Sequence, residues 1–297
     1  MSGGRIDPGR VVVGLAGWGD HNELYPPGTA SKDRLAQYAE FFPVVEVDSS
    51  FYAIQPPERS ARWCSDTPAS FRFVVKAYQG MTGHQRGGAS KSPYESVEAM
   101  YAAFLESVRP MREAGKLTAV LFQYPPWFDC TKDNVRVLRE TKARMGDVPC
   151  ALEFRHQSWF APEYRDKTIG FMKDQGWIHS VCDEPQAGVG SVPTVLAATT
   201  EDVTIVRMHG RNVAGWNQSG SPNWREIRYL YQYNAEELTE WLSGIALLLR
   251  DTKQVCMLFN NNSGGHAAGN AKQFMRMLGQ ETREIPRQLD LFHTEED

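Results

Sequence analysis

Eight short runs of apolar, mostly β-branched residues recur along this chain of 297 residues, and they constrain its fold more than any other feature. Most are continuous apolar stretches, which is typical of parallel strands buried on both faces. They are Val11–Ala16, Val44–Asp48, Phe71–Lys76, Thr118–Gln123, Cys150–Arg155, Ile178–Asp183, Val203–His209 and Val255–Asn260. The segments between them are long enough for a helix each, so the order of elements predicts an α/β fold.

Three of the intervening segments show helical periodicity: Ser31–Phe42 with Ser31 as N-cap, Ser92–Arg112, and Ala235–Leu249. Eight strands alternating with helices predict a single (β/α)8 TIM-like barrel with parallel strands over residues 1–279. An open doubly wound sheet is the alternative, but no G-x-G-x-x-G turn follows the first run. Residues 280–297 are charged and are predicted to form a flexible C-terminal tail.

The composition is that of an ordinary globular protein, with 41% hydrophobic and 23% charged residues. The net charge is −4, so any contact with nucleic acid must use a local basic patch rather than bulk charge. No run approaches the roughly 20 apolar residues of a membrane span, and Met1–Arg10 lacks the apolar core of a signal peptide. Five cysteines without a C-x-x-C pair indicate reduced thiols. These features predict a cytoplasmic protein without a membrane partner.

Polar side chains close seven of the eight runs. Residues two apart on a strand face the same way, so each pair of this spacing points to one side. The pairs are Glu46 with Asp48, Glu153 with Arg155, Arg207 with His209, and Asn260 with Asn262, while Lys76, Gln123 and Asp183 end three further runs. The C-terminal ends of barrel strands converge on one mouth, where barrel enzymes place their chemistry. The pattern therefore predicts a functional pocket at this mouth.

A purely structural interpretation is the alternative: Glu46 and Glu153 would neutralise Arg207 and Arg155 in a self-satisfied ion-pair layer. Buried ion pairs give little net stability compared with apolar packing, so a barrel under selection for stability alone would use Val, Ile and Leu there. This favours the functional pocket.

The residue types suggest acid–base chemistry on an anionic substrate. The predicted catalytic groups are Glu46, Asp48, Glu153 and Asp183 as general bases and His209 as general acid. Guanidinium groups bind phosphate bidentately, and aromatic rings stack on a base or a sugar. The predicted substrate- or phosphate-binding residues are Trp18, Tyr52, Lys76, His84, Gln123, Arg155, Trp159, Arg207, Arg211 and Asn260.

Metal binding is left open. Of the seven histidines only His209 clearly ends a strand, and no H-E-x-x-H motif is present, which argues against a histidine-rich zinc site. An all-oxygen site for Mg²⁺ or Mn²⁺ is the other option, and it would draw on Glu46, Asp48, Glu153 or Asp183.

A series of ordered motifs spans the chain from about Val13 to Leu278. They include Gly14-Leu-Ala-Gly-Trp18, Val45-Glu-Val-Asp-Ser-Ser-Phe-Tyr52, Phe73-Val-Val-Lys76, Leu121-Phe-Gln-Tyr-Pro-Pro126, Leu152-Glu-Phe-Arg-His156, Arg207-Met-His-Gly-Arg211 and Phe259-Asn-Asn-Asn262. With them the chain resembles the YecE-like family, also described as domain of unknown function 72. The resemblance implies a TIM-barrel-like fold and no settled activity. The family's likeness to endonuclease IV and xylose isomerase barrels is one of fold, which does not fix function.

The sequence Gln288-Leu-Asp-Leu-Phe292 lies in the tail. It resembles the short peptide by which bacterial polymerases and repair proteins dock on the DNA sliding clamp, in which Gln288, Leu289, Leu291 and Phe292 would contact the clamp. A linear peptide of this kind needs only a preformed apolar pocket on its partner. The alternative is a tail that packs back on the barrel.

Three hypotheses about function follow. The leading one is a DNA- or phosphodiester-processing enzyme, nuclease-like or a repair factor, that the sliding clamp recruits. The second is a hydrolase or isomerase acting on carbohydrates or sugar phosphates, since paired carboxylates near tryptophans suit glycosides. The third is a non-catalytic adaptor that binds DNA or a nucleotide.

Overall fold

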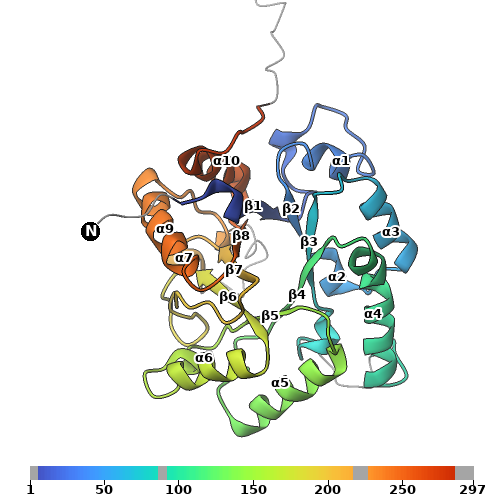
Figure 1. Cartoon of the computed structure of the whole chain (residues 1–297), viewed down its shortest axis with the longest axis vertical. Helices are drawn as coiled ribbons and strands as arrows, with labels where there is room; N and C mark the ends of the chain where they lie inside the picture. The colour runs from blue at the N-terminus through green and yellow to red at the C-terminus, as the bar shows by residue number, and fades with distance from the viewer. Residues whose placement is uncertain (1–5, 86–91, 217–226, 285–297) are drawn as a thin grey trace, which may run out of the picture.

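Eight parallel strands close into a barrel in chain order, from β1 next to β2 round to β8 next to β1 (Figure 1). The computed structural model describes residues 6–85, 92–216 and 227–284. The strands are β1 Val11–Ala16, β2 Val44–Val47, β3 Arg72–Lys76, β4 Leu117–Gln123, β5 Cys150–Glu153, β6 Trp177–Asp183, β7 Val203–Met208 and β8 Gln254–Phe259. The predicted (β/α)8 TIM-like barrel is confirmed.

The helices lie outside the strands, as a ring around the barrel in Figure 1. They are α1 Arg34–Tyr38, α2 Ser49–Tyr52, α3 Pro57–Ser65, α4 Val97–Glu113, α5 Lys132–Met145, α6 Arg165–Asp174, α7 Val213–Trp216, α9 Ala235–Leu248 and α10 His266–Leu278. Short 3-10 helices add η1 Pro8–Arg10, η2 Asn22–Leu24, η3 Gln79–Met81, η5 Gln157–Phe160 and η6 Ser263–Gly265.

Side-chain caps fix where two of the three predicted helices begin. The Ser96 hydroxyl accepts the amide of Ala99 at the start of α4, and Asn234 forms a capping box with Glu237 at the start of α9. The prediction of one helix over Ser31–Phe42 capped by Ser31 is wrong. Here α1 is confined to Arg34–Tyr38 without a side-chain cap, and the chain after it tightens into i→i+3 hydrogen bonds.

Two apolar regions hold the fold together. A large core fills the space between the barrel and its helices. A smaller one lies inside the barrel and consists of Val44, Val74, Ala119, Leu121, Ala151, Ile178, Val203, Ile205, Cys256 and Leu258, which we call the apolar layer. At Gly14 of β1 an added Cβ would lie 2.0 Å from the carbonyl oxygen of Val44, so only glycine allows this close approach of strands.

All five cysteines are free thiols. Within the described ranges, no helix combines the length and the apolar character that crossing a membrane requires.

Candidate active site

A polar layer follows the apolar layer inside the barrel, one two-residue step toward the C-terminal ends of the strands. Val44 is followed by Glu46, Ala151 by Glu153, and Ile205 by Arg207. The members that we call the polar layer are Glu46, Gln123, Glu153, Arg155, Ser180, Cys182, Glu184, Arg207, His209 and Asn260. Because strand side chains alternate, the same parity that buries the apolar layer brings these groups together.

Arg207 is the centre of the polar layer. Its Nε and Nη2 donate to the two carboxylate oxygens of Glu46 at 2.8 and 2.6 Å, a bidentate pairing. Its Nη1 lies 2.8 Å from each oxygen of Glu153 and 3.4 Å from the Gln123 side-chain oxygen. Arg207, Glu46 and Glu153 are at most 1% exposed. The buried ion pairs that the structural interpretation expected between arginine and glutamate side chains are therefore present.

Arg155 extends the ion pairs to a third carboxylate. Its Nη2 lies 2.6 Å from Glu153 Oε1 and 2.9 Å from His209 Nε2, and its Nη1 donates to Glu184. Glu184 also accepts the amide of Val192 at 2.7 Å. The buried chain Glu46–Arg207–Glu153–Arg155–Glu184 thus holds three carboxylates and two guanidinium groups. The sequence had suggested that Arg155 and Arg207 hold phosphate; here most of their donors are already engaged.

The carboxyl groups of this chain differ in acidity. Burial raises the pKa of Glu46 to about 7, despite its pairing with Arg207. Burial likewise raises the pKa of Glu184 to about 7, against the opposing effect of Arg155. For Glu153, burial would raise the pKa, but Arg155 and Arg207 outweigh it and hold the pKa well below the usual value. The two ends of the chain therefore titrate near neutrality while its middle stays ionised.

His209 is a neutral imidazole in this setting. Burial lowers its pKa well below 6.5, and Arg155 and Arg207 lower it further. Arg155 Nη2 lies 2.9 Å from the Nε2 atom of the ring and Asn260 Nδ2 lies 2.9 Å from its Nδ1 atom, so the ring is held on both sides. A ring that stays neutral at pH 7 holds no extra proton to give away, so this environment disfavours the general-acid role expected for His209.

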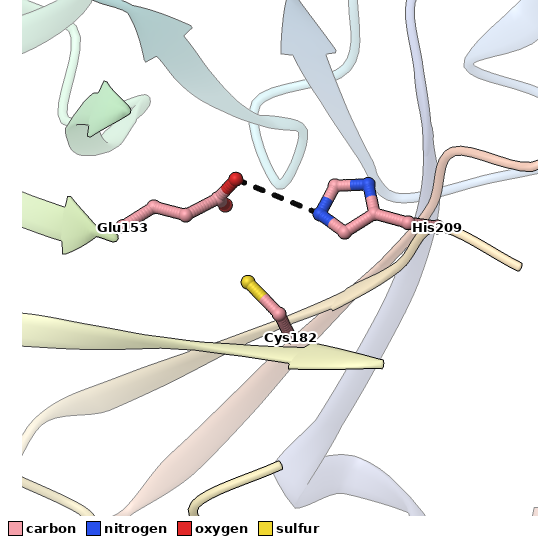
Figure 2. Close-up of side chains that lie close together, drawn as sticks. All are labelled: Glu153, Cys182 and His209. Atoms are coloured by element: carbon pink, nitrogen blue, oxygen red, sulfur yellow. Dashed lines mark ion pairs between the residues drawn. The ribbon is translucent and has the colours of Figure 1, made fainter. Parts of the chain in front are cut away.

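Glu153, Cys182 and His209 form the single group in the described part of the chain that has the donor spacing for a metal ion (Figure 2). The group does not fit one. Glu153 already accepts from Arg155 and Arg207, which would lie beside any bound cation. The oxygen ligand of this group is therefore already committed to the protein's own ion pairs.

The rim of the mouth carries the partly exposed candidates. Lys76 Nζ lies 3.4 Å from Asp48 Oδ1, and both act on the pKa of Glu46, Asp48 by raising it and Lys76 by lowering it. Gln123 and Asn260 join them at intermediate exposure. These four side chains connect the buried polar layer to solvent.

Asp183 and Arg211 lie together but away from the polar layer. Arg211 Nη2 is 2.8 Å from Asp183 Oδ2, and the Trp241 indole of α9 donates to the same carboxylate. Asp183 has the opposite parity to Ser180, Cys182 and Glu184, so it faces the helices instead of the barrel interior. The expectation that all strand-end polar groups meet at one site fails for this pair.

The four aromatic and imidazole candidates have different positions. Trp159 is buried at 1% exposure, stacks on Phe154 and donates to the carbonyl of Phe128, so it is part of the core. Trp18 packs edge-on against Trp63. Tyr52 is 55% exposed. The His84 Nδ1 atom lies 2.8 Å from the Thr82 hydroxyl.

Two described residues of the segment after β7, Trp216 and Arg228, pack beside the polar layer, and sequence reasoning did not single out Arg228. Trp216 of α7 lies over His209, with ring centroids 6.5 Å apart. The Arg228 guanidinium carbon is 3.8 Å from the Trp216 ring, and that of Arg155 is 5.7 Å from it. The Nε atoms of Arg155 and Arg228 are both buried without a hydrogen-bond partner. Arg228 lies in a long aperiodic segment, where strand periodicity gives no signal.

Sequence reasoning also overlooked Ser180, Cys182 and Glu184. Ser180 donates to Glu153 at 3.0 Å, and Glu184 ends the ion-pair chain. Counting in steps of two from the buried Ile178 would have found all three residues, and would have placed Asp183 outside.

A cavity of about 650 Å³ lies away from these groups, lined by Arg10, Lys173, Thr200, Glu201, Asp251, Lys253 and their neighbours. Its lining comes from segments that directly precede β1, β7 and β8 and from Lys173 near the C-terminal end of α6, at the end opposite the mouth. Barrel chemistry occurs at the C-terminal ends of the strands, so we place the candidate site in the polar layer.

A closed parallel barrel with buried acids and guanidinium groups at its C-terminal mouth places this chain among TIM-type barrel proteins with a polar mouth. The sequence model of the family described as "Protein of unknown function DUF72" matches residues 12–292, and the chain belongs to this family. The match extends through Gln288–Phe292, which contains the predicted clamp-binding motif. All residues of this motif lie outside the described residues.

Similar proteins support this assignment. The chain is 56% identical to the UPF0759 protein YunF of Bacillus subtilis over 284 residues, 95% of this chain and 100% of YunF. It is 24% identical to the UPF0759 protein YecE of Escherichia coli over 54% of this chain and 53% of YecE. A crystal structure of a DUF72 family protein from Enterococcus faecalis matches with a TM-score of 0.85 and 37% identity, covering 94% of this chain and 100% of that one.

Proposed function

We propose that this protein is an acid–base enzyme that acts on a phosphodiester, with DNA as the substrate. The observation that carries the proposal is Glu46, a buried carboxyl whose pKa is about 7 at the mouth of the barrel. A general acid or base is most effective when its pKa lies near the working pH. A barrel built only for stability has no use for such a group in place of an apolar side chain.

The roles follow from position. Glu46 transfers the proton; burial raises its pKa, Arg207 opposes this, and the partly exposed Asp48 and Lys76 act on the pKa in opposite directions. Arg207 holds Glu46 in one orientation through its two hydrogen bonds and is a positioning residue. His209, neutral and fixed by Asn260, orients Arg155.

Cationic groups with unused donors support an anionic substrate. Lys76 is partly exposed at the rim, and the Nε atoms of Arg155 and Arg228 have no hydrogen-bond partner. Among the described residues, Arg228 makes no ion pair with a carboxylate. Phosphate oxygens are the acceptors that guanidinium groups prefer. Recruitment through Gln288–Phe292 to the sliding clamp would bring this site to DNA, and it belongs to the same proposal.

The test is cleavage of nicked, abasic, mismatched and single-stranded DNA, each with and without Mg²⁺, Mn²⁺ and Zn²⁺. We expect Glu46→Gln to lower kcat by about 100-fold or more, as loss of a general acid or base does. The matched control is Glu98→Gln on the outer helix α4, where the side chain is 74% exposed. No cleavage, no binding and no effect of Glu46→Gln on any substrate would refute the proposal.

One observation favours a second candidate, the non-catalytic adaptor: the carboxylates and guanidinium groups largely satisfy one another. An adaptor would bind DNA or a nucleotide with unchanged affinity after Glu46→Gln and would release no product. Single-turnover experiments at saturating protein separate the two functions, because they detect even slow chemistry.

A further inference from the structure

A row of aromatic rings runs along the rim of the mouth on the side of β2, β3 and β4. It consists of Tyr52, Phe51, His84 and Trp127, which we call the rim row. Adjacent ring centroids are 5.2 Å apart for Tyr52 and Phe51, 5.1 Å for Phe51 and His84, and 5.9 Å for His84 and Trp127. All three contacts are edge-to-face. Three separate segments after successive strands therefore contribute to one continuous aromatic surface.

The two ends of the rim row face solvent. Tyr52 is 55% exposed and Trp127 is 59% exposed, whereas Phe51 and His84 between them are half-buried. Trp177 and Trp241, in contrast, are at most 4% exposed. Keeping a tryptophan in water forgoes its burial, so an exposed ring that adjoins a polar mouth points to a ligand with a flat face.

The rim row also has a cation at its centre. Lys76 Nζ lies 5.0 Å from the Phe51 ring centroid while it pairs with Asp48. Burial lowers the pKa of His84 to about 4, helped by Lys76 and Arg155, so His84 is a neutral ring at pH 7. The row thus offers aromatic faces at its ends and a positive charge beside them, next to the buried polar layer.

We propose that the rim row binds single-stranded nucleic acid, with unpaired bases stacked on Trp127 and Tyr52 and a backbone phosphate at Lys76. Aromatic platforms combined with a cation are how proteins bind single strands without reading their sequence, because every base has a π-face. Paired bases in a duplex are stacked on each other and cannot reach these rings. The inference rests on the proposed function and names its substrate as single-stranded.

The experiment measures fluorescence anisotropy of a labelled oligothymidylate, which forms no duplex, with full-length protein. Trp127→Ala should weaken binding at least about fivefold, and Tyr52→Ala should act in the same direction, as expected for the loss of one base stack. Trp127→Phe keeps a stacking face and should restore most of the affinity. The control is Tyr164→Ala, a 40% exposed aromatic residue beside α6, which should bind as the wild type does.

Several results would overturn the inference. A duplex of equal length that binds as tightly would contradict single-strand recognition, and unchanged binding by Trp127→Ala would contradict stacking. Quenching of tryptophan fluorescence by a neutral oligosaccharide, and not by oligothymidylate, would assign the rim row to sugars. Thermal melting of each variant shows whether the fold is intact.

The proposed function can fail separately. The rim row is tested by binding of oligothymidylate to Trp127→Ala, and the proposed chemistry is tested by turnover in Glu46→Gln, so the two readouts are independent. Tight binding without turnover of any DNA would refute the proposed chemistry and keep the rim row. If Glu46→Gln abolishes turnover and Trp127→Ala leaves binding unchanged, the proposed chemistry stands and the binding role of the rim row is refuted.

Discussion

The apolar layer and the polar layer lie on the same strands, two residues apart, and they are buried in different ways. Leu121, Ile205 and Leu258 fill the barrel interior with side chains that need no partner. Two residues later on the same strands, Gln123, Arg207 and Asn260 are polar. The charged Arg207 is buried only because carboxylates pair with it, and the Asn260 amide contacts His209. The comparison indicates that apolar packing stabilises the closed barrel and that the charged groups at the mouth serve a function other than stability.

The largest effect is expected where that pairing is broken. Arg207→Met leaves Glu46 and Glu153 without their central partner, and we expect a loss of about 3–5 kcal/mol in the free energy of unfolding. Urea unfolding at neutral pH measures it. Arg109→Met on the outer face of α4, which removes two exposed ion pairs, should cost less than about 1 kcal/mol. Equal losses for the two variants would contradict a buried network.

The apolar layer should respond through cavity formation. Leu258→Ala removes a buried side chain from a closed interior, and we expect the free energy of unfolding to fall by about 2–5 kcal/mol. Because no charge is involved, the loss should be the same at about pH 5 and about pH 8. A loss that changes between these pH values would mean that the two layers are not independent.

A smaller, pH-dependent effect distinguishes the polar layer. The folded pKa of Glu46 is raised to about 7, above its unfolded value of about 4.3. The folded state therefore binds more protons than the unfolded state in this window, and the group's contribution to stability falls as pH rises from about 4.3 to about 7. Glu46→Gln should make the decline of stability with pH shallower, and the remaining decline belongs to Glu184, whose pKa is also raised to about 7. A wild type and variant whose stabilities run parallel with pH would show that Glu46 has an ordinary pKa.

The smallest effect on stability is expected in the tail, although its effect on binding is large. Changing Leu291 and Phe292 together to Ala should abolish binding to the sliding clamp, since apolar and aromatic anchors dominate small interfaces, and should leave the melting temperature unchanged. Surface plasmon resonance with immobilised clamp measures the binding. A lower melting temperature would place these residues on the barrel instead.

Much of this arrangement follows from the sequence, and the exceptions have physical reasons. Continuous apolar runs and their order predict the barrel, because strands buried on both faces leave that pattern. Alternation along the strands predicts that Glu46, Glu153 and Arg207 lie together. Ending the sixth run at its last polar residue, Asp183, without checking which face that residue is on places Asp183 in the site and misses Glu184. The acidity of Glu46 and Glu153 depends on burial and on which guanidinium groups surround them, so no local pattern predicts it. Arg228 belongs to the segment after β7, whose sequence shows no strand or helix periodicity.

We infer that the polar layer keeps two carboxyl groups, Glu46 and Glu184, protonated close to neutral pH, because burial raises the pKa of each to about 7. Difference infrared spectroscopy between about pH 5 and about pH 9 observes the carbonyl stretch of a protonated carboxyl directly. We expect a band from buried protonated carboxyl groups that disappears with an apparent midpoint near pH 7. The band should be smaller in Glu46→Gln, and the remainder belongs to Glu184. A spectrum without such a band above about pH 6, in the wild type as in the variant, would contradict it.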